Sequence, residues 1–188
     1  MKVHDYHAGN RQMQDKFGTR KLADRMAERA SEVISDDARG MIERAEMFFL
    51  ATCDERGLPT CSYKGGAPGF VRVLDESTIA FPNYDGNGKY QSMGNLLQNP
   101  NAGLLFIDFE NQSRLRLQGA VSIDDDDPLL GEYHEAQFIV RLKVTEVYPN
   151  CPRYIPKMTQ VEPSVYIPKA GRETPQPRWK SRPEYQVD

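Results

Sequence analysis

Cysteine and histidine are scarce in this sequence: its 188 residues include three of each. Cys53, Cys61 and Cys151 form no C-x-x-C pair, whereas structural zinc sites combine four such ligands at short spacings. We therefore expect no metal site. Cys53 and Cys61 fall on the two arms of one predicted hairpin, but a disulfide between them is disfavoured because the chain otherwise has cytoplasmic character.

Long apolar runs and basic clusters are also missing. No stretch approaches the ~20 apolar residues of a membrane span, and the polar segment 1–17 has no apolar core of the kind found in signal peptides. The 24 Lys and Arg residues are outnumbered by 27 Asp and Glu, which gives a formal net charge of −3. A field of that sign does not favour nucleic acids. We expect a cytoplasmic protein with neither nucleic-acid nor membrane partners.

The residue arrangements of a hydrolase are absent as well. The sequence has no G-x-S-x-G motif, and His134 has Glu132 and Glu135 beside it but no evident nucleophile. The catalytic residues therefore stay unassigned. A protein without reactive groups of its own, but with loops suited to phosphate, is expected to take its chemistry from a cofactor.

The patterns that are present predict one domain. Residues 1–46 form an N-terminal segment that is loosely held over 1–16 and helical over 18–32 and 37–46, with Ser35 as the cap of the second helix. Residues 47–148 are rich in short apolar or alternating runs separated by turn signals, which indicates a β-barrel. Residues 149–188 begin with a short helix and continue as a Pro-rich extended tail.

Within the barrel region, hairpins are expected over 47–62 and around the turn at 75–77. A short helix over 91–98 ends at Asn99 before Pro100. Further strands are expected over 102–109, 114–123 and 138–148. The tally is about six antiparallel strands with flanking helices, so the fold is mainly β.

Three clusters could bind a ligand, and each has an ordinary structural alternative. The stretch "SYKGGAPG" over 62–69 lets a flat or anionic ligand approach the backbone, or it is a bulge at a barrel corner. The stretch "PNYDGNGKYQSMGN" over 82–95 leads a Gly-rich loop into a helix, as phosphate sites do, or it is a plain loop with a cap. Arg114 and Arg116 share one strand face and could grip a phosphate or a ring edge, or pair with carboxylates in solvent.

The order of these clusters resembles the pyridoxamine 5′-phosphate oxidase-like flavoproteins. The matching stretch runs from about residue 48 to 123 and includes "FFLATCDERGLPTCSYKGG", "IAFPNY", "NLLQNPNAGLLFIDF" and "LRLQG". The pattern N-L-x-x-N-P-x-x-x-L-x-F is its most specific part. The full chain is similar to a bacterial subgroup of oxidase-related flavoproteins whose substrate is unassigned.

The resemblance implies a six-stranded antiparallel split β-barrel that forms a homodimer, with FMN at the subunit interface. It places the first wall of the flavin ring on Ser62, Tyr63, Lys64 and Gly65, and the second on Pro82, Asn83 and Tyr84. Lys89, Ser92 and Asn95 would hold the phosphate. Arg114 and Arg116 would reach the flavin from the partner subunit or from beside it, and Trp179 would close the site.

The true oxidases carry R-x-V-L-L-K on the strand that aligns with residues 62–67, and this sequence has Ser62 and Ala67 at the Arg and Lys positions. The resemblance therefore points to an FMN-dependent oxidoreductase that acts on a small molecule with a nicotinamide nucleotide or oxygen as redox partner. The alternative is a non-catalytic flavin or haem carrier. Pyridoxamine 5′-phosphate oxidation and F420-dependent reduction are ranked lower.

Overall fold

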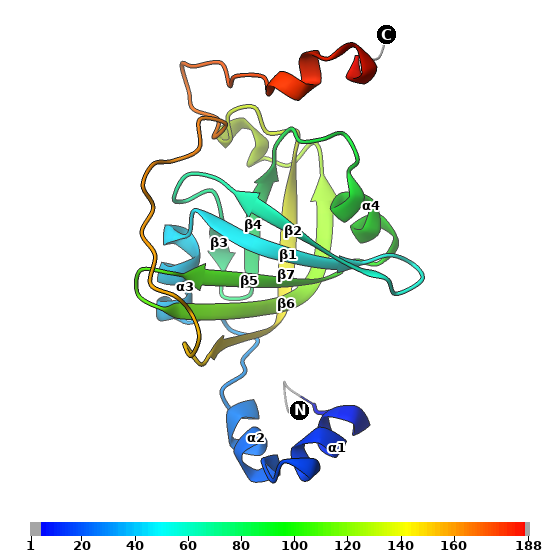
Figure 1. Ribbon diagram of the computed structural model, residues 1–188, viewed down its shortest axis with the longest axis vertical. Helices are drawn as coiled ribbons and strands as arrows, with labels where there is room; N and C mark the ends of the chain where they lie inside the picture. Colours follow the sequence, from blue (N-terminus) through cyan, green and yellow to red (C-terminus); the bar gives the residue numbers. More distant parts are fainter. Residues whose placement is uncertain (1–4, 187–188) are drawn as a thin grey trace.

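The architecture is a barrel-like antiparallel sheet with helices at its edges and a long C-terminal segment along one side (Figure 1), as seen in a computed structural model that describes residues 5–186. Its strands are β1 (Met47–Cys53), β2 (Pro59–Gly65), β3 (Arg72–Asp75), β4 (Thr78–Asn83), β5 (Asn101–Asp108), β6 (Ser113–Asp124) and β7 (Phe138–Asn150). The helices are α1 (Ala8–Lys16), α2 (Arg20–Ala27), α3 (Asp36–Arg44) and α4 (Gln91–Gln98), with 3-10 turns η1 (Leu130–Glu132), η2 (Arg178–Ser181) and η3 (Pro183–Tyr185).

The strands form one sheet in the order β2-β1-β5-β6-β7-β4-β3, with every neighbouring pair antiparallel. This confirms the predicted mainly β class. The expected count of about six strands was one short of the seven that the described residues form. The sheet curls so that β1 and β2 lie in front of β4 and β7 (Figure 1).

Alternation along the strands fills the barrel interior. On β1, Phe48 and Leu50 are fully buried and alternate with more exposed neighbours, and on β6 Leu115 and Leu117 alternate with Arg114 and Arg116. The ring of Phe48 contacts the rings of Phe81 and Phe106 at centroid distances of 5.0 and 5.2 Å. Contacts of this size between aromatic rings contribute beyond their buried area, and they join three strands that are distant in sequence.

A β-bulge bends the longest strand pair. The register of β6 against β7 shifts between Gln118 and Gly119. A Cβ on Gly119 would lie 2.1 Å from the carbonyl oxygen of Lys143, so only glycine fits there. The bulge accentuates the local twist that lets a sheet close on itself.

Helix α3 begins as predicted, because the Ser35 hydroxyl accepts a hydrogen bond from the backbone N–H of Ala38. Residues 1–16 were predicted to be loosely held; residues 1–4 lie outside the described range, and residues 8–16 are helical. These residues form α1, whose first turn is capped by the imidazole Nδ1 of His7, which accepts from the N–H groups of Gly9 and Asn10. A histidine cap is outside the usual Ser, Thr, Asp and Asn set, so the sequence pattern did not reveal it.

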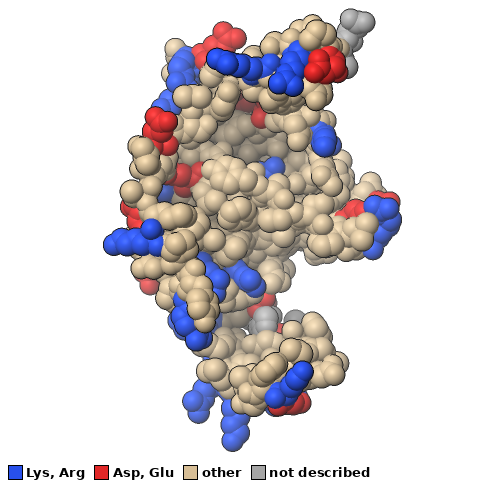
Figure 2. Space-filling model, viewed as in Figure 1, with Lys and Arg blue, Asp and Glu red and all other residues tan. Residues whose placement is uncertain are grey.

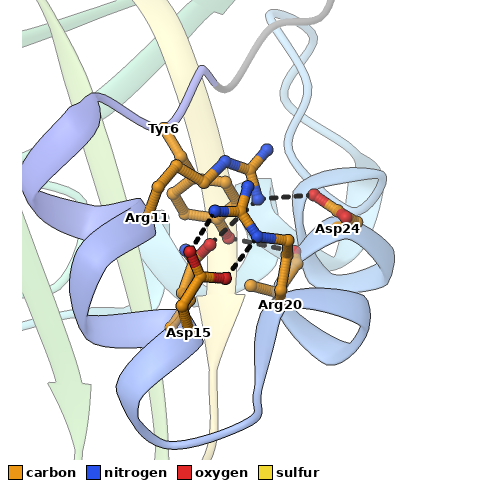
Figure 3. A network of polar contacts seen from close by, with 7 residues as sticks. Tyr6, Arg11, Asp15, Arg20 and Asp24 are labelled. Carbon is orange, nitrogen blue, oxygen red and sulfur yellow. Dashed lines mark hydrogen bonds and ion pairs between the residues drawn. The ribbon is translucent and has the colours of Figure 1, made fainter.

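Helices α1 and α2 form a hairpin apart from the barrel (Figure 1) that is held together by charged groups (Figure 3). Arg11 bonds to Asp24 at 2.8 Å and Arg20 bonds to Asp15 at 2.5 Å, while the Tyr6 hydroxyl donates to the carbonyl of Ala23. Neither helix buries a residue. Exposed ion pairs contribute about 0–1 kcal/mol each, so these contacts stabilise the hairpin only weakly.

The C-terminal segment differs from expectation in two places. Residues 151–158 form a turn and extended chain, where a short helix was expected, and the tail contains the 3-10 turns η2 and η3. The remainder is extended, as the prolines require. Figure 1 shows this segment running beside α3 and the ends of β1, β2 and β5, then over the top of the barrel.

Candidate functional site

The inner face of β2 and helix α4 form the first part of the candidate site. In β2, Thr60, Ser62 and Lys64 alternate with more exposed neighbours and face the same side. The Ser62 and Ser92 hydroxyls lie 3.0 Å apart, which places the first turn of α4 against β2. Lys64 is the next side chain of the same face, about 6.6 Å along the strand from Ser62.

The beginning of α4 leaves backbone donors available. Its N-cap residue, Tyr90, has a left-handed backbone with φ 47° and gives no side-chain cap. The first N–H groups of the helix therefore lack an intrahelical partner, and they carry the positive end of the helix dipole. The preceding glycine-rich loop holds Lys89, which is exposed. This geometry suits an anion such as a phosphate.

Among the charged groups near β2 and α4, Lys64 has the most unusual environment. Its side chain is half-buried, and burial lowers the pKa of its ammonium group. Within residues 5–186, no carboxylate lies within ion-pair distance of it. Burying a cation without a counter-ion is costly. A bound phosphate would supply the missing charge, so these residues fit the phosphate of FMN.

Asn95, which the resemblance assigns to the phosphate, contacts the β1–β2 hairpin. Its amide nitrogen donates to the hydroxyl oxygens of Thr52 and Thr60, at 3.1 and 3.3 Å, and these hydroxyls lie 2.9 Å apart. Thr52 is 2% exposed. The three side chains attach α4 to the β1–β2 hairpin and so fix the position of its first turn.

The last residues of β4 and the residue that follows it form the second wall. Pro82 and Asn83 are buried, and the Asn83 amide donates to the side chain of Gln137 at 2.9 Å. The Tyr90 hydroxyl reaches the same Gln137 oxygen at 3.1 Å. Gln137 thereby connects the strand end to the loop before α4. Tyr84 is half-buried, and burial raises the pKa of its phenol.

A cleft of about 1060 Å³ opens beside this wall. Tyr63, Gly65 and Tyr84 line one side, and residues 158–168 of the tail line the other. Figure 2 shows the hollow beneath the C-terminal segment. Tyr63 thus lies on the opposite face of β2 from Ser62 and Lys64, and the strand contributes to both the phosphate site and the cleft.

Arg114 and Arg116 do not join the phosphate site of their own chain. The register places Arg116 opposite Leu105, Leu105 opposite Phe49 and Phe49 opposite Tyr63, so these four share the outer face of the sheet. Residues around Arg116 line a shallow groove of about 540 Å³. Arg114, on the same strand face, is half-buried, and its Nε has no hydrogen-bond partner within the described residues.

Trp179 lies in η2, with its ring against Tyr185 at a centroid distance of 5.6 Å. Its neighbour Lys180 bonds to Asp85, two residues after β4 ends. The C-terminal segment therefore reaches the loop that precedes α4, although the Trp179 ring is 36% exposed.

Cys53 and Cys61 line the groove beside Arg116, and among the described residues no cysteine or histidine lines the larger cleft. The three cysteines are free, and Cys53 lies opposite Pro59, so the disfavoured Cys53–Cys61 disulfide is not formed. Within the described range, no group of three or more His, Cys, Asp and Glu side chains is arranged to hold a metal. No helix among these residues is long and apolar enough to cross a membrane.

Sequence comparison decides the family. The family model described as pyridoxamine 5′-phosphate oxidase matches residues 34–153, more than half of the chain. The chain belongs to this family. The matched stretch begins just before α3, ends after β7 and contains every candidate site residue except Trp179. A comparison with curated proteins finds no match.

Solved structures of similar fold come from several bacteria. A candidate pyridoxamine 5′-phosphate oxidase from Lactobacillus delbrueckii has 20% identity and a TM-score of 0.52, covering 63% of this chain and 95% of its own. HupZ of Group A Streptococcus has 18% identity and a TM-score of 0.50, covering 62% and 93%. An FMN-binding protein from Syntrophomonas wolfei has 13% identity and a TM-score of 0.48, covering 74% and 97%. At these identities the first two show a shared fold, the split barrel of the family.

Sequence reasoning missed Thr52, Thr60 and Gln137. The two threonines could have been found, because hairpin register places Thr52 opposite Thr60 on the face of Ser62. Gln137 gave no local signal, since it meets Asn83 across 54 residues of chain. The part of the tail that lines the cleft could not be predicted from the sequence either, because an extended Pro-rich segment has no periodicity that indicates where it packs.

Proposed function

We propose that this protein binds FMN and is an FMN-dependent oxidoreductase that acts on a small molecule, with a nicotinamide nucleotide or oxygen as redox partner. The observation that carries the proposal is the environment of Lys64, whose half-buried ammonium has a lowered pKa and no carboxylate partner within residues 5–186. Lys64 lies two residues along β2 from Ser62, which contacts the uncapped first turn of α4. Membership of the pyridoxamine 5′-phosphate oxidase family supports the choice of flavin.

In this proposal the residues hold different parts of the cofactor. Lys64, Ser62, Ser92 and the first N–H groups of α4 bind the phosphate, with Lys89 nearby in solvent. Tyr63, Gly65, Pro82, Asn83 and Tyr84 border the ring. When bound, the flavin supplies two-electron transfer. The chain's own contribution is to bind, orient and shield, since Tyr84 and the tail exclude water from one side of the ring.

We also propose a homodimer formed through the outer sheet face. That face carries the apolar row Phe49 and Leu105 and the small residues Ala51 and Gly103, which allow close approach. Arg114 and Arg116 project from the same face. In a dimer of this kind they would extend toward the partner's cofactor, which gives a reason for two guanidinium groups on a largely apolar surface.

The test has two steps. Purified protein is titrated with FMN, and uptake of the flavin with a shift of its visible spectrum is expected; a protein that takes up no FMN overturns the proposal. The loaded protein is then mixed with NADH or NADPH without oxygen. Rapid bleaching supports an oxidoreductase. A flavin that is reduced only by a strong chemical reductant would instead indicate a carrier.

A further inference from the structure

The cleft beneath the tail has a strongly acidic lining. Among its side chains are five carboxylates and a single guanidinium, that of Arg44; the carboxylates are Glu46, Asp85, Asp108, Glu110 and Glu162. Lys180 bonds to Asp85 from outside the lining. Even with that ion pair counted, the acidic groups exceed the basic groups by three. Figure 2 shows both acidic and basic side chains along the left edge of this face and within the hollow, so the acidic excess rests on the residues that line the cleft.

Asp108 and Glu110 are held by hydrogen bonds within the cleft. Burial tends to raise the pKa of Asp108, but hydrogen bonds from the backbone and side chain of Asn111 outweigh it and hold the pKa below its ordinary value. The Glu110 carboxylate accepts from the Thr159 hydroxyl at 2.7 Å. A site with this excess of negative charge attracts cations and repels anions.

The rest of the lining is apolar and aromatic. Met41 and Phe109 contribute from the barrel side, Tyr63 and Tyr84 from the predicted flavin wall, and Met158 and Tyr166 from the tail. Aromatic faces bind organic cations through their quadrupoles, and methionines adapt to flat apolar groups. Combined with the acidic excess, this lining suits a ligand with both a positive charge and an apolar ring.

The tail is anchored on both sides of the cleft. At the near end, the Met158 N–H donates to the Phe109 carbonyl and the Gln112 side chain donates to the Ile155 carbonyl, at 3.2 and 2.8 Å. At the far end, the Thr174 N–H donates to Glu135 at 3.1 Å, and Lys180 bonds to Asp85. The residues between these anchors span the cleft as a partial roof and leave it open to solvent elsewhere.

We infer that the cleft under residues 158–168 binds the substrate, and that the substrate is an aromatic organic cation such as an amine. The inference rests on the proposed function, because the cleft borders the flavin through Tyr63, Gly65 and Tyr84. Its volume slightly exceeds that of common small-molecule sites, which are about 300–1,000 Å³. An anionic substrate carrying its own phosphate would meet repulsion there.

The experiment compares two fluorescent probes of matched shape, naphthylmethylamine and naphthylacetate, in titrations of the full chain. We expect the dissociation constant of the amine to be at least about tenfold lower than that of the acetate, and to rise with added salt. Equal affinity, tighter binding of the acetate, or no binding of the amine would overturn the inference.

Two double variants localise the binding. Glu46→Gln with Glu162→Gln removes two charges from the cleft, and Glu28→Gln with Glu55→Gln removes two charges elsewhere. The first should weaken amine binding about tenfold and the second should leave it unchanged; equal effects would refute the location. FMN uptake is measured on the same samples. A protein that takes up FMN but does not prefer the amine to the acetate would refute only this inference. A protein that prefers the amine but takes up no FMN would refute the proposed function.

Discussion

At the scale of single residues, Lys64 is the clearest sign of a ligand. Charged lysines are almost never buried unless paired, and Lys64 is half-buried beside Ser62 and Ser92 with no carboxylate in reach within the described chain. The strand pattern of β2 can be recognised in the sequence, so the position of Ser62 and Lys64 on the same face of the strand could be predicted. The lowered pKa of Lys64 could not, because it depends on what the rest of the barrel covers.

That lowered pKa gives a pH prediction. Burial favours the neutral amine, so the free protein gains stability as pH rises through the lowered pKa toward the ordinary value of 10.5. A bound phosphate needs the charged form, so FMN affinity should fall about tenfold across the same window. Titrations of Lys64→Met should show weaker binding and no such fall.

The control for this experiment is Lys21→Met, in the exposed helix α2. It should keep both the wild-type affinity and the wild-type pH profile. The flavin phosphate itself does not obscure the result, because its second pKa lies near 6, well below this window. A Lys64→Met variant that retains the fall in affinity would show that another group titrates.

At the scale of elements, the site depends on how α4 is attached. Asn95 binds Thr52 and Thr60, and Ser92 binds Ser62. The helix itself was predictable from its apolar spacing and from the Asn99–Pro100 stop. Its attachment was only partly predictable, since it requires the hairpin register together with a contact between Asn95 and Thr52 across 43 residues.

The β6–β7 bulge supplies a second prediction. In Gly119→Ala, the added Cβ would meet backbone atoms of Lys143 and Val144. These cannot move without disturbing the sheet, so the variant should lose about 2 kcal/mol or more of unfolding free energy, measured by urea denaturation. Gly131→Ala is the matched control, because open space surrounds that position; a similar loss there would remove the bulge as the cause.

The N-terminal hairpin shows where prediction from sequence stops. The thin apolar face of Leu22 and Met26 correctly indicated a helix, but both side chains are more than 40% exposed. Helix α1 escaped prediction because its cap is His7. Amphipathic spacing predicts that a helix forms, whereas its place against the barrel depends on contacts that spacing does not encode.

At the scale of the whole molecule, the fold was predictable and the assembly is a proposal. The barrel was predicted from strand spacing and alternation. The split-barrel type was predicted from the family resemblance, which the family match confirms. The tail was predicted to be extended, yet its path along the cleft is set by single contacts such as Thr159 with Glu110. Such contacts have no signature in a Pro-rich segment.

The proposed dimer gives a prediction at this scale. Ala51 is exposed in the middle of the outer sheet face. Ala51→Arg places a charge there, so it should raise the dimer dissociation constant at least about tenfold, seen as a lower sedimentation coefficient, while circular dichroism stays native. Glu55→Arg, in the exposed turn beside that face, should remain dimeric. A wild-type protein that sediments as a monomer at every concentration would refute the dimer.

The most direct test of the account compares FMN with riboflavin, which lacks the phosphate, by calorimetric titration of the wild-type protein and of Lys64→Met. If Lys64 and the first turn of α4 hold the phosphate, the wild type binds FMN about 10- to 100-fold more tightly than riboflavin, as charge-assisted hydrogen bonds of about 1.5–3 kcal/mol imply. Most of that preference should vanish in Lys64→Met. Equal affinity for the two flavins in the wild type, or an undiminished preference in the variant, would contradict the account.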